Sequence, residues 1–177
     1  MQPSQARKEL PNIMLQINRN NHTALQARRE PLTDDQLRSI APSIFAEDKH
    51  SSRSERYSYI PTIHVLNGLR KEGFLPFYVA QSRTRLEDRR DFTKHLIRFR
   101  HIDHINALAV GDEFPEISLL NSHDGTSSYI MDSAIYRLAC SNGLIVASGD
   151  VQSIKVPHKG NVRDMVIVSL RQNGVSR

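Results

Sequence analysis

Two runs of aromatic and β-branched residues on either side of a charged segment constrain the fold of this chain more than any other feature. Residues 74–85 and 92–101 have the composition of strands, and residues 86–91 between them carry five charged side chains. Two such runs joined by a polar connection predict an antiparallel β-hairpin. We expect this hairpin to form part of a larger sheet.

Two helices are predicted before the hairpin. Thr33 and Gln36 have the spacing of a capping box, in which a hydroxyl and an amide each satisfy a free backbone N–H. Pro42 limits the length of the helix that follows. Apolar residues at helical spacing predict a second helix over residues 61–72, with Gly73 as its left-handed C-terminal cap.

The second half of the chain predicts one more helix and further strands. Residues 128–140 are interpreted as a helix, ended by the Asn142-Gly143 pair. Its apolar face would be formed by Ile130, Ala134, Ile135 and Leu138. Residues 117–121 are predicted as a strand, and residues 144–147 and 152–156 as a second hairpin.

This order of elements predicts an α+β fold, with a mainly antiparallel sheet, a basic β-hairpin and two or three helices packed on one face. Residues 1–31 are predicted to be a peripheral arm or edge element, and residues 32–177 a single α+β domain. Cys140 is the only cysteine, which excludes an internal disulfide and a multi-cysteine zinc site. The sequence has no run of 18 apolar residues and no secretory h-region, so we expect a cytoplasmic protein with no membrane span.

Positive charge is concentrated in one part of the sequence. The formal net charge is +5, from 24 Lys and Arg against 19 Asp and Glu. Residues 49–80 carry five basic and two acidic side chains, and residues 81–101 carry seven and three, whereas residues 1–48 are neutral and residues 102–177 are acidic. A dense local charge attracts an anionic partner, and we expect that partner to be nucleic acid, DNA rather than RNA.

The predicted hairpin would gather much of this charge on one face, because side chains alternate between the faces of a strand. A turn centred between residues 88 and 89 would place Arg83 opposite Lys94. Five basic side chains would then share one face: Arg83, Arg85, Lys94, Arg98 and Arg100. The other face, with Ile97 and Phe99, would pack on a helix. A basic face suits a phosphate backbone, although a solvated hairpin with arginines paired to Glu87, Asp88 and Asp91 remains the alternative.

Residues 50–59, HSSRSERYSY, form the most unusual segment of the sequence. Its hydroxyl, guanidinium and phenol groups are those that hold phosphate oxygens and stack on bases. We expect Arg53 and Arg56 to contact phosphates, and Tyr57 and Tyr59 to stack on bases. The alternative is an ordered loop whose serines cap backbone groups and whose tyrosines pack on the sheet edge.

Catalytic and metal-binding interpretations are weaker. His101 and His104 have an H-x-x-H spacing near His95, but a hydrogen-bonded core histidine is the commoner outcome for a residue on the face of Ile97. Cys140 would lie at a helix C-terminus, the end that does not lower a thiol pKa, so it is interpreted as buried and structural. Because the sequence holds no phosphate-binding loop, nucleophile elbow or dinucleotide fingerprint, no cofactor, metal or catalytic residue is predicted.

Several motifs, in order along the chain, resemble a family found on phages, plasmids and integrative elements, known as domain of unknown function 932. The motifs are residues 44–46 (IFA), 50–57 (HSSRSERY), 60–62 (IPT), 81–83 (QSR), 94–98 (KHLIR), 140–144 (CSNGL) and 156–160 (VPHKG). The resemblance implies a mobile-element context and a bacterial cytoplasm, but no activity, fold or catalytic residue. Family members continue with a further helical region, so this chain resembles either a short or a truncated form.

Two functions of different classes follow from the sequence. The first is a non-enzymatic nucleic-acid-binding protein of a mobile element, acting in recombination, replication or protection of its DNA. A homo-oligomer is one arrangement of such a protein, because repeated basic surfaces along one strand raise the affinity. The second is a protein-binding counter-defence or regulatory module, whose arginines would meet an acidic host-protein surface. A hydrolase using His95, His101, His104 or Cys140 is a third and weaker interpretation.

Overall fold

The computed structural model describes residues 22–26, 30–47, 61–105, 109–138, 145–147 and 152–156. The strands are β1 (His22–Gln26), β2 (Phe74–Ser82), β3 (His95–His101), β4 (Glu113–Asn121), β5 (Tyr129–Leu138), β6 (Ile145–Ala147) and β7 (Gln152–Val156). The helices are α2 (Asp34–Ile40) and α3 (Thr62–Lys71), with the short 3-10 helices η1 (Pro42–Phe45), η2 (Glu87–Phe92) and η3 (Ile102–His104).

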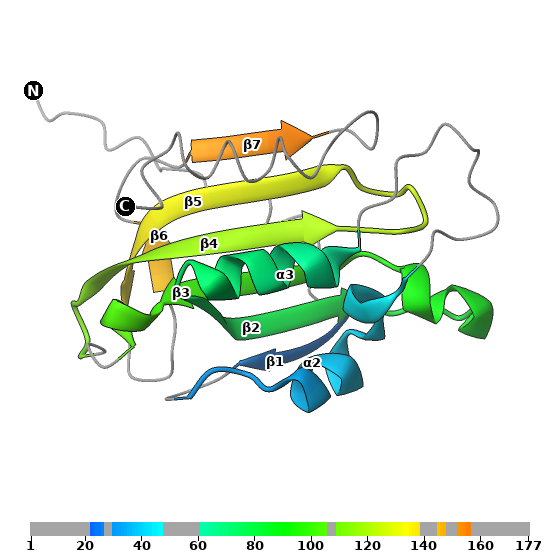
Figure 1. The fold of residues 1–177 in the computed structure, drawn as a ribbon, viewed down its shortest axis with the longest axis horizontal. Coiled ribbons are helices and arrows are strands. Elements are labelled where there is room, and N and C mark those ends of the chain that lie inside the picture. The colour runs from blue at the N-terminus through cyan, green and yellow to red at the C-terminus, as the bar shows by residue number, and fades with distance from the viewer. Residues whose placement is uncertain are drawn as a thin grey trace, which may run out of the picture.

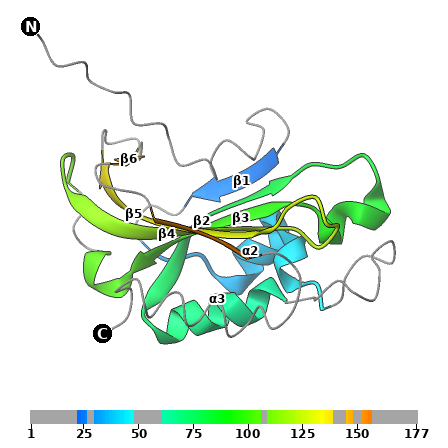
Figure 2. The same ribbon diagram turned by 90° about the horizontal axis from the view of Figure 1, so that it is seen from above.

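The seven strands of the described residues belong to one sheet, in the order β1-β2-β3-β4-β5-β6, and β7 pairs with β5 beside β6. Every pair is antiparallel. Helices α2 and α3 lie on one side of the sheet, whereas its two ends, β1 and β6, curve toward the other side (Figures 1 and 2). The predicted α+β class, with a mainly antiparallel sheet, is therefore confirmed. None of the helices in the described part of the chain is long and apolar enough to cross a membrane.

The helices before the hairpin are confirmed. Thr33 caps α2 with a complete capping box: the Thr33 hydroxyl accepts from the Gln36 backbone N–H, and the Gln36 side chain accepts from that of Thr33. Helix α3 begins at Thr62 and ends at Lys71. Gly73 has the predicted positive φ, 84°, and a Cβ added to it would lie 2.7 Å from His101 Nε2.

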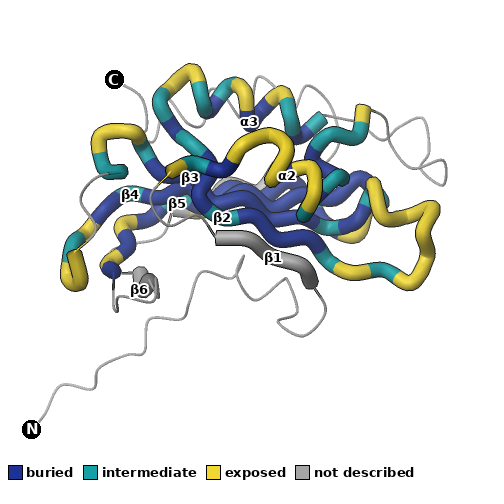
Figure 3. The backbone as a smooth tube through the Cα atoms, turned by 90° about the horizontal axis from the view of Figure 1, so that it is seen from below, coloured by how far each residue is buried: buried dark blue, intermediate teal, exposed yellow. Residues whose placement is uncertain are grey.

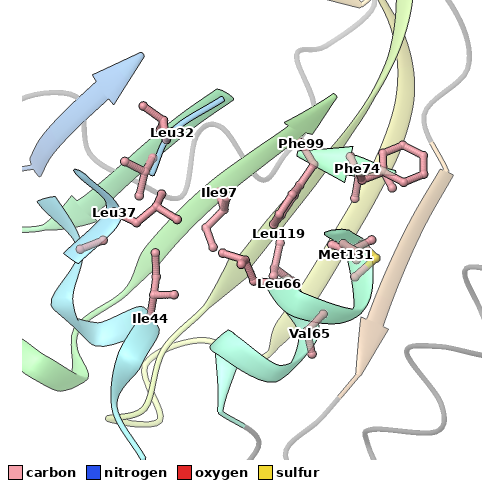
Figure 4. Close-up of a cluster of buried hydrophobic side chains, with 14 of the residues drawn as sticks. Leu32, Leu37, Ile44, Val65, Leu66, Phe74, Ile97, Phe99, Leu119 and Met131 are labelled. Atoms are coloured by element: carbon pink, nitrogen blue, oxygen red, sulfur yellow. The ribbon is translucent and has the colours of Figure 1, made fainter. Parts of the chain in front are cut away.

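The main hydrophobic core lies between the sheet and the helices (Figure 4). Ile97 and Phe99 of β3 point into this core, as predicted, and both are fully buried. Leu66 of α3 and Leu119 of β4 pack in the same cluster. Alternation along β3 therefore sends Leu96, Arg98 and Arg100 to the opposite side of the sheet, away from the helices.

The predicted helix over residues 128–140 is wrong, because residues 129–138 form strand β5. Its apolar residues at helical spacing are also compatible with a strand, since β5 is buried on both sides for its first four residues, 129–132. The second predicted hairpin is also wrong: β6 and β7 both pair with β5 and not with each other. The predictions for Cys140 and the Asn142-Gly143 pair fall outside the described residues.

Candidate functional site

The register of β2 and β3 differs by one residue from the predicted register. Gln81 pairs with His95, and the Ser82 N–H donates to the Lys94 carbonyl at 2.8 Å. The prediction that Arg83 lies opposite Lys94 is therefore wrong. The cause is the connection: residues 83–94 form a long loop that contains η2 and not a tight turn, so burial of the apolar residues sets the register.

Two of the predicted phosphate contacts are buried. Arg98 and Arg100 are each 5% exposed and bind the two oxygens of Glu116, which is 1% exposed. Arg98 donates from Nε and Nη2 to Glu116 Oε2 at 2.8 and 2.6 Å, and Arg100 does the same to Oε1 at 3.0 and 2.6 Å. We call these three residues the buried arginine cluster. They cannot reach a phosphate backbone in this structure, so the prediction of a single basic face that includes them is wrong.

Aromatic rings line both guanidiniums of the buried arginine cluster. Arg98 lies over Tyr78 and Tyr136, with its guanidinium carbon 5.3 and 5.9 Å from the ring centroids. Arg100 lies over Phe77 and Phe114 at 4.9 and 4.4 Å. Burial raises the pKa of the Tyr78 and Tyr136 phenols, so both rings stay neutral. Cation–π contacts and charge-assisted hydrogen bonds together make this cluster a closed structural unit.

The other arginines of this region are exposed. We call residues 83–94 the basic connection. Its arginines are exposed and its lysine is partly buried (Figure 3): Arg83, Arg85, Arg89, Arg90 and Lys94. Three exposed carboxylates lie among them: Glu87, Asp88 and Asp91. Within the described part of the chain, no ion pair joins Arg85, Arg89 or Arg90 to a carboxylate, so these three guanidiniums face solvent.

The described residues on either side of the segment predicted to contact nucleic acid lie near the basic connection. Arg53, Arg56, Tyr57 and Tyr59 lie outside the described residues. Helix η1, just before that segment, packs against η2. Thr62, just after it, is bonded to His95 at the start of β3. The described residues before and after the segment are therefore packed beside the basic connection.

A chain of buried polar side chains lies beneath the basic connection, on the helix side of the sheet. We call it the buried relay; its members, all at most 4% exposed, are Ser43, Thr62, Gln81, His95 and Asn121. Asn121 Nδ2 donates to Thr62 Oγ1 at 2.9 Å, and Thr62 Oγ1 lies 2.9 Å from His95 Nε2. On the other side of the ring, Ser43 Oγ lies 2.7 Å from His95 Nδ1. The relay thus joins β2, β3, β4, η1 and α3.

The hydrogen-bond pattern of the buried relay assigns the tautomer of His95. Its Nδ1 lies 3.2 Å from the carbonyl oxygen of Thr93, which can only accept, so the proton belongs on Nδ1. Ser43 donates its own proton to Gln81 Oε1 at 2.7 Å and therefore accepts from His95. Thr62 then donates to the unprotonated Nε2. Because burial disfavours a second proton, the pKa of His95 falls to about 4.

This assignment bears on chemistry. The Ser43 hydroxyl donates to an amide oxygen, and the nearby imidazole nitrogen already carries a proton, so His95 is not placed to activate Ser43 as a nucleophile. The prediction that His95 is a hydrogen-bonded core histidine is confirmed. Within the described ranges, no group of three or more His, Cys, Asp or Glu residues is arranged to hold a metal ion.

Sequence reasoning missed most of the buried relay. From the sequence, Thr62 is the start of a helix and Gln81 and Asn121 are strand residues. Thr62 and Gln81 also fall in the motifs of residues 60–62 and 81–83, but no contact between these residues is predicted. The available signal was weak: a Gln and a His at paired positions of two otherwise apolar strands. Their bonds to one another depend on three other elements, η1, α3 and β4, which come together only in the folded chain.

Comparison with known proteins gives a family match. The family model described as Domain of unknown function (DUF932) matches residues 49–173. Two proteins of Escherichia coli (strain K12), UPF0380 protein YafZ and UPF0380 protein YfjQ, are each 50% identical to this chain over 140 residues. That alignment covers 79% of this chain and 50% of each relative, so the chain spans about half the length of these curated relatives. No solved structure matches the chain.

Proposed function

This chain belongs to the family of domain of unknown function DUF932, and we propose that it is a non-enzymatic nucleic-acid-binding protein, with DNA rather than RNA as its ligand. We place it in the bacterial cytoplasm, on the DNA of a mobile element. One observation carries the proposal: Arg85, Arg89 and Arg90 are exposed on a connection whose backbone is anchored to buried groups of the sheet. Cations held this way can track a phosphate backbone without disturbing the fold.

The contact set differs from the one that the sequence predicts. Arg85, Arg89 and Arg90 form its centre, and Arg83 and Lys94 flank them on the same connection. Arg98 and Arg100 are removed from the set, because Glu116 binds both. The segment with Arg53, Arg56, Tyr57 and Tyr59 is proposed to extend this surface. The proposal is supported by the described residues on either side of it, η1 and Thr62, which lie beside the connection.

The physical basis of the binding is counterion release. Each phosphate neutralised by Arg or Lys frees condensed ions, so the affinity for a duplex falls with salt by about 0.9 log units per log unit of salt and per contact. Three to five contacts therefore give a slope of about −3 to −4.5 on duplex DNA. Carboxylates within the connection weaken the local field but leave its net charge positive.

The test is fluorescence anisotropy of a labelled duplex and a labelled single strand, titrated with the full chain over a series of salt concentrations. Replacing Arg89 and Arg90 together with Ala should flatten the duplex slope by about 1.5 to 2. The matched control replaces Lys71 and Arg137 together with Ala, because both are exposed and lie at the opposite end of the sheet. The control carries the same change in net charge and should keep the slope.

Two results would overturn the proposal. One is the absence of binding to either oligonucleotide at low salt, which would favour an acidic protein as the partner of the same arginines. The other is an equal loss of slope in the test and control variants, which would show that net charge and not the basic connection governs binding.

A further inference from the structure

We infer that Gln81 and Thr93 are positioning residues for the nucleic-acid contact: they hold the basic connection in the shape in which its arginines meet phosphates. This inference rests on the proposed function and extends it, because it gives the buried relay a part in binding. Neither residue can touch the nucleic acid, since Gln81 is 4% and Thr93 6% exposed.

The first observation is a double hydrogen bond to one backbone atom. The carbonyl oxygen of Arg90 accepts from Gln81 Nε2 at 2.8 Å and from Thr93 Oγ1 at 3.2 Å. The Arg90 side chain itself is exposed. The backbone of this residue is thus tied to the interior of the molecule, while its guanidinium faces solvent.

A second anchor lies two residues further along the connection. The carbonyl oxygen of Phe92 accepts from the backbone N–H groups of His123 at 2.9 Å and Asp124 at 3.1 Å. These donors belong to the loop between β4 and β5. The connection is therefore held at Arg90 by a side chain of β2 and at Phe92 by the loop between β4 and β5. Residues 83–89 lie between the end of β2 and the anchor at Arg90.

The side chain of Gln81 is itself oriented. Its Oε1 accepts from the hydroxyl and the backbone N–H of Ser43, at 2.7 and 3.2 Å. With the oxygen fixed toward η1, the amide nitrogen must face Arg90. The buried relay therefore sets the direction of the donor that holds the connection, and it ties that donor through His95 to Thr62 at the start of α3.

The consequence for binding is thermodynamic. Immobilising a long side chain and its loop on binding costs free energy, and a loop that is already held avoids part of this cost. A purely structural role for Gln81 and Thr93 would lower the stability of the fold but leave the affinity of the folded protein unchanged. A positioning role would lower the affinity at an unchanged salt slope, because the number of arginines is the same.

The test uses the full chain and three substitutions, made singly or in combination. Gln81→Met keeps the length of the side chain without its polar groups, and Thr93→Val keeps the shape of the side chain without its hydroxyl. The double variant should bind duplex DNA about five- to tenfold more weakly, which corresponds to the free-energy cost of immobilising one side chain on binding. The dependence of its affinity on salt should be unchanged. Thr93→Ser keeps the hydroxyl and should restore most of the loss that Thr93→Val alone causes.

Amide hydrogen exchange of the free protein provides a readout that does not depend on binding. The Arg89 amide, which donates to the Leu86 carbonyl at 3.1 Å, should exchange faster in the double variant and in Thr93→Val. A core variant of β4, Ile117→Val, controls for general destabilisation and should leave both this exchange and the affinity as in the wild type.

The outcomes separate the two proposals. Absence of wild-type binding would overturn the proposed function and the positioning role with it. Wild-type binding with unchanged affinity and unchanged Arg89 exchange in both Thr93→Val and the double variant would overturn only the positioning role. Weaker binding with a flatter slope would also contradict it, because contacts would then have been lost and not merely loosened.

Discussion

Two buried polar clusters lie on opposite sides of strand β3, and one is neutral whereas the other is charged. On the helix side, His95 belongs to a neutral hydrogen-bonded relay that leads to the backbone of the basic connection. On the other side, Arg98 and Arg100 belong to a charged cluster whose donors converge on Glu116. The neutral cluster is hydrogen-bonded to the backbone of an exposed loop, whereas the arginines of the charged cluster donate to a buried carboxylate. Arginine content alone therefore does not locate a binding surface: burial and partners decide which guanidiniums are available.

The largest expected effect concerns the charged side of this comparison. Glu116→Gln should lower the free energy of unfolding by about 3–5 kcal/mol, because it leaves two buried guanidiniums without their carboxylate. Urea denaturation followed by circular dichroism measures the change. Glu113→Gln on the same strand is the control, since Glu113 is exposed and its replacement should cost no more than about 0.5 kcal/mol. A loss below about 1 kcal/mol for Glu116→Gln would show that the cluster is weakly coupled to the fold.

The neutral side should respond to pH. Burial lowers the pKa of His95 to about 4 in the folded protein, whereas the pKa of a histidine in an unfolded chain is about 6.5. Between these values the unfolded chain binds more protons, so this contribution is fully present above pH 6.5 and is lost as the pH falls toward 4. At pH 5 the loss should be about 2 kcal/mol relative to pH 7.5.

The check is the difference in unfolding free energy between these two pH values, measured for the wild type and for His95→Gln. The variant should lack most of this pH dependence. His64→Gln is the control, because His64 is exposed on α3 and its replacement should preserve the wild-type difference. Equal pH dependence in the wild type and His95→Gln would contradict the assignment of a neutral, buried His95.

A smaller effect is expected within the relay. Thr62→Val keeps the shape of the side chain but removes the hydroxyl that accepts from Asn121 and donates to His95. Leaving these buried groups without a partner should cost about 1–3 kcal/mol of unfolding free energy. Thr62→Ser, which retains the hydroxyl, should lose less than Thr62→Val. The reverse order in urea denaturation would show that packing of the methyl group and not the hydrogen bond matters at this position.

The sequence predicted local structure better than it predicted pairing. The capping box at Thr33, helix α3 and the positive φ of Gly73 follow from short-range rules, and all three are present. Strand β5 was interpreted as a helix because burial on both sides removes the alternation that marks a strand, and only its neighbours in the sheet determine its state.

The candidate site shows the same division. Exposure of Arg85 could be inferred from a charged connection, and alternation gave the face of Arg98 and Arg100, but the burial of that face could not be inferred from the two strands alone. The displacement of one residue changed which side chains of β2 share a face with those of β3, so that Gln81 lies beside His95 and Tyr78 beside Arg98. The carboxylate that receives them, Glu116, lies on β4, which the pairing of β2 and β3 alone could not bring into view.

The smallest expected effect on stability accompanies the central claim. Replacing Arg89 and Arg90 together with Ala should change the free energy of unfolding by less than about 0.5 kcal/mol, because both side chains are exposed. The measurement that tests the claim most directly is the anisotropy of a labelled duplex bound by this variant and by the wild type, from low to near-physiological salt. We expect wild-type binding with a slope of about −3 to −4.5 and a variant that is folded but flatter by about 1.5 to 2. Equal slopes for the two proteins, or no wild-type binding at low salt, would contradict the account.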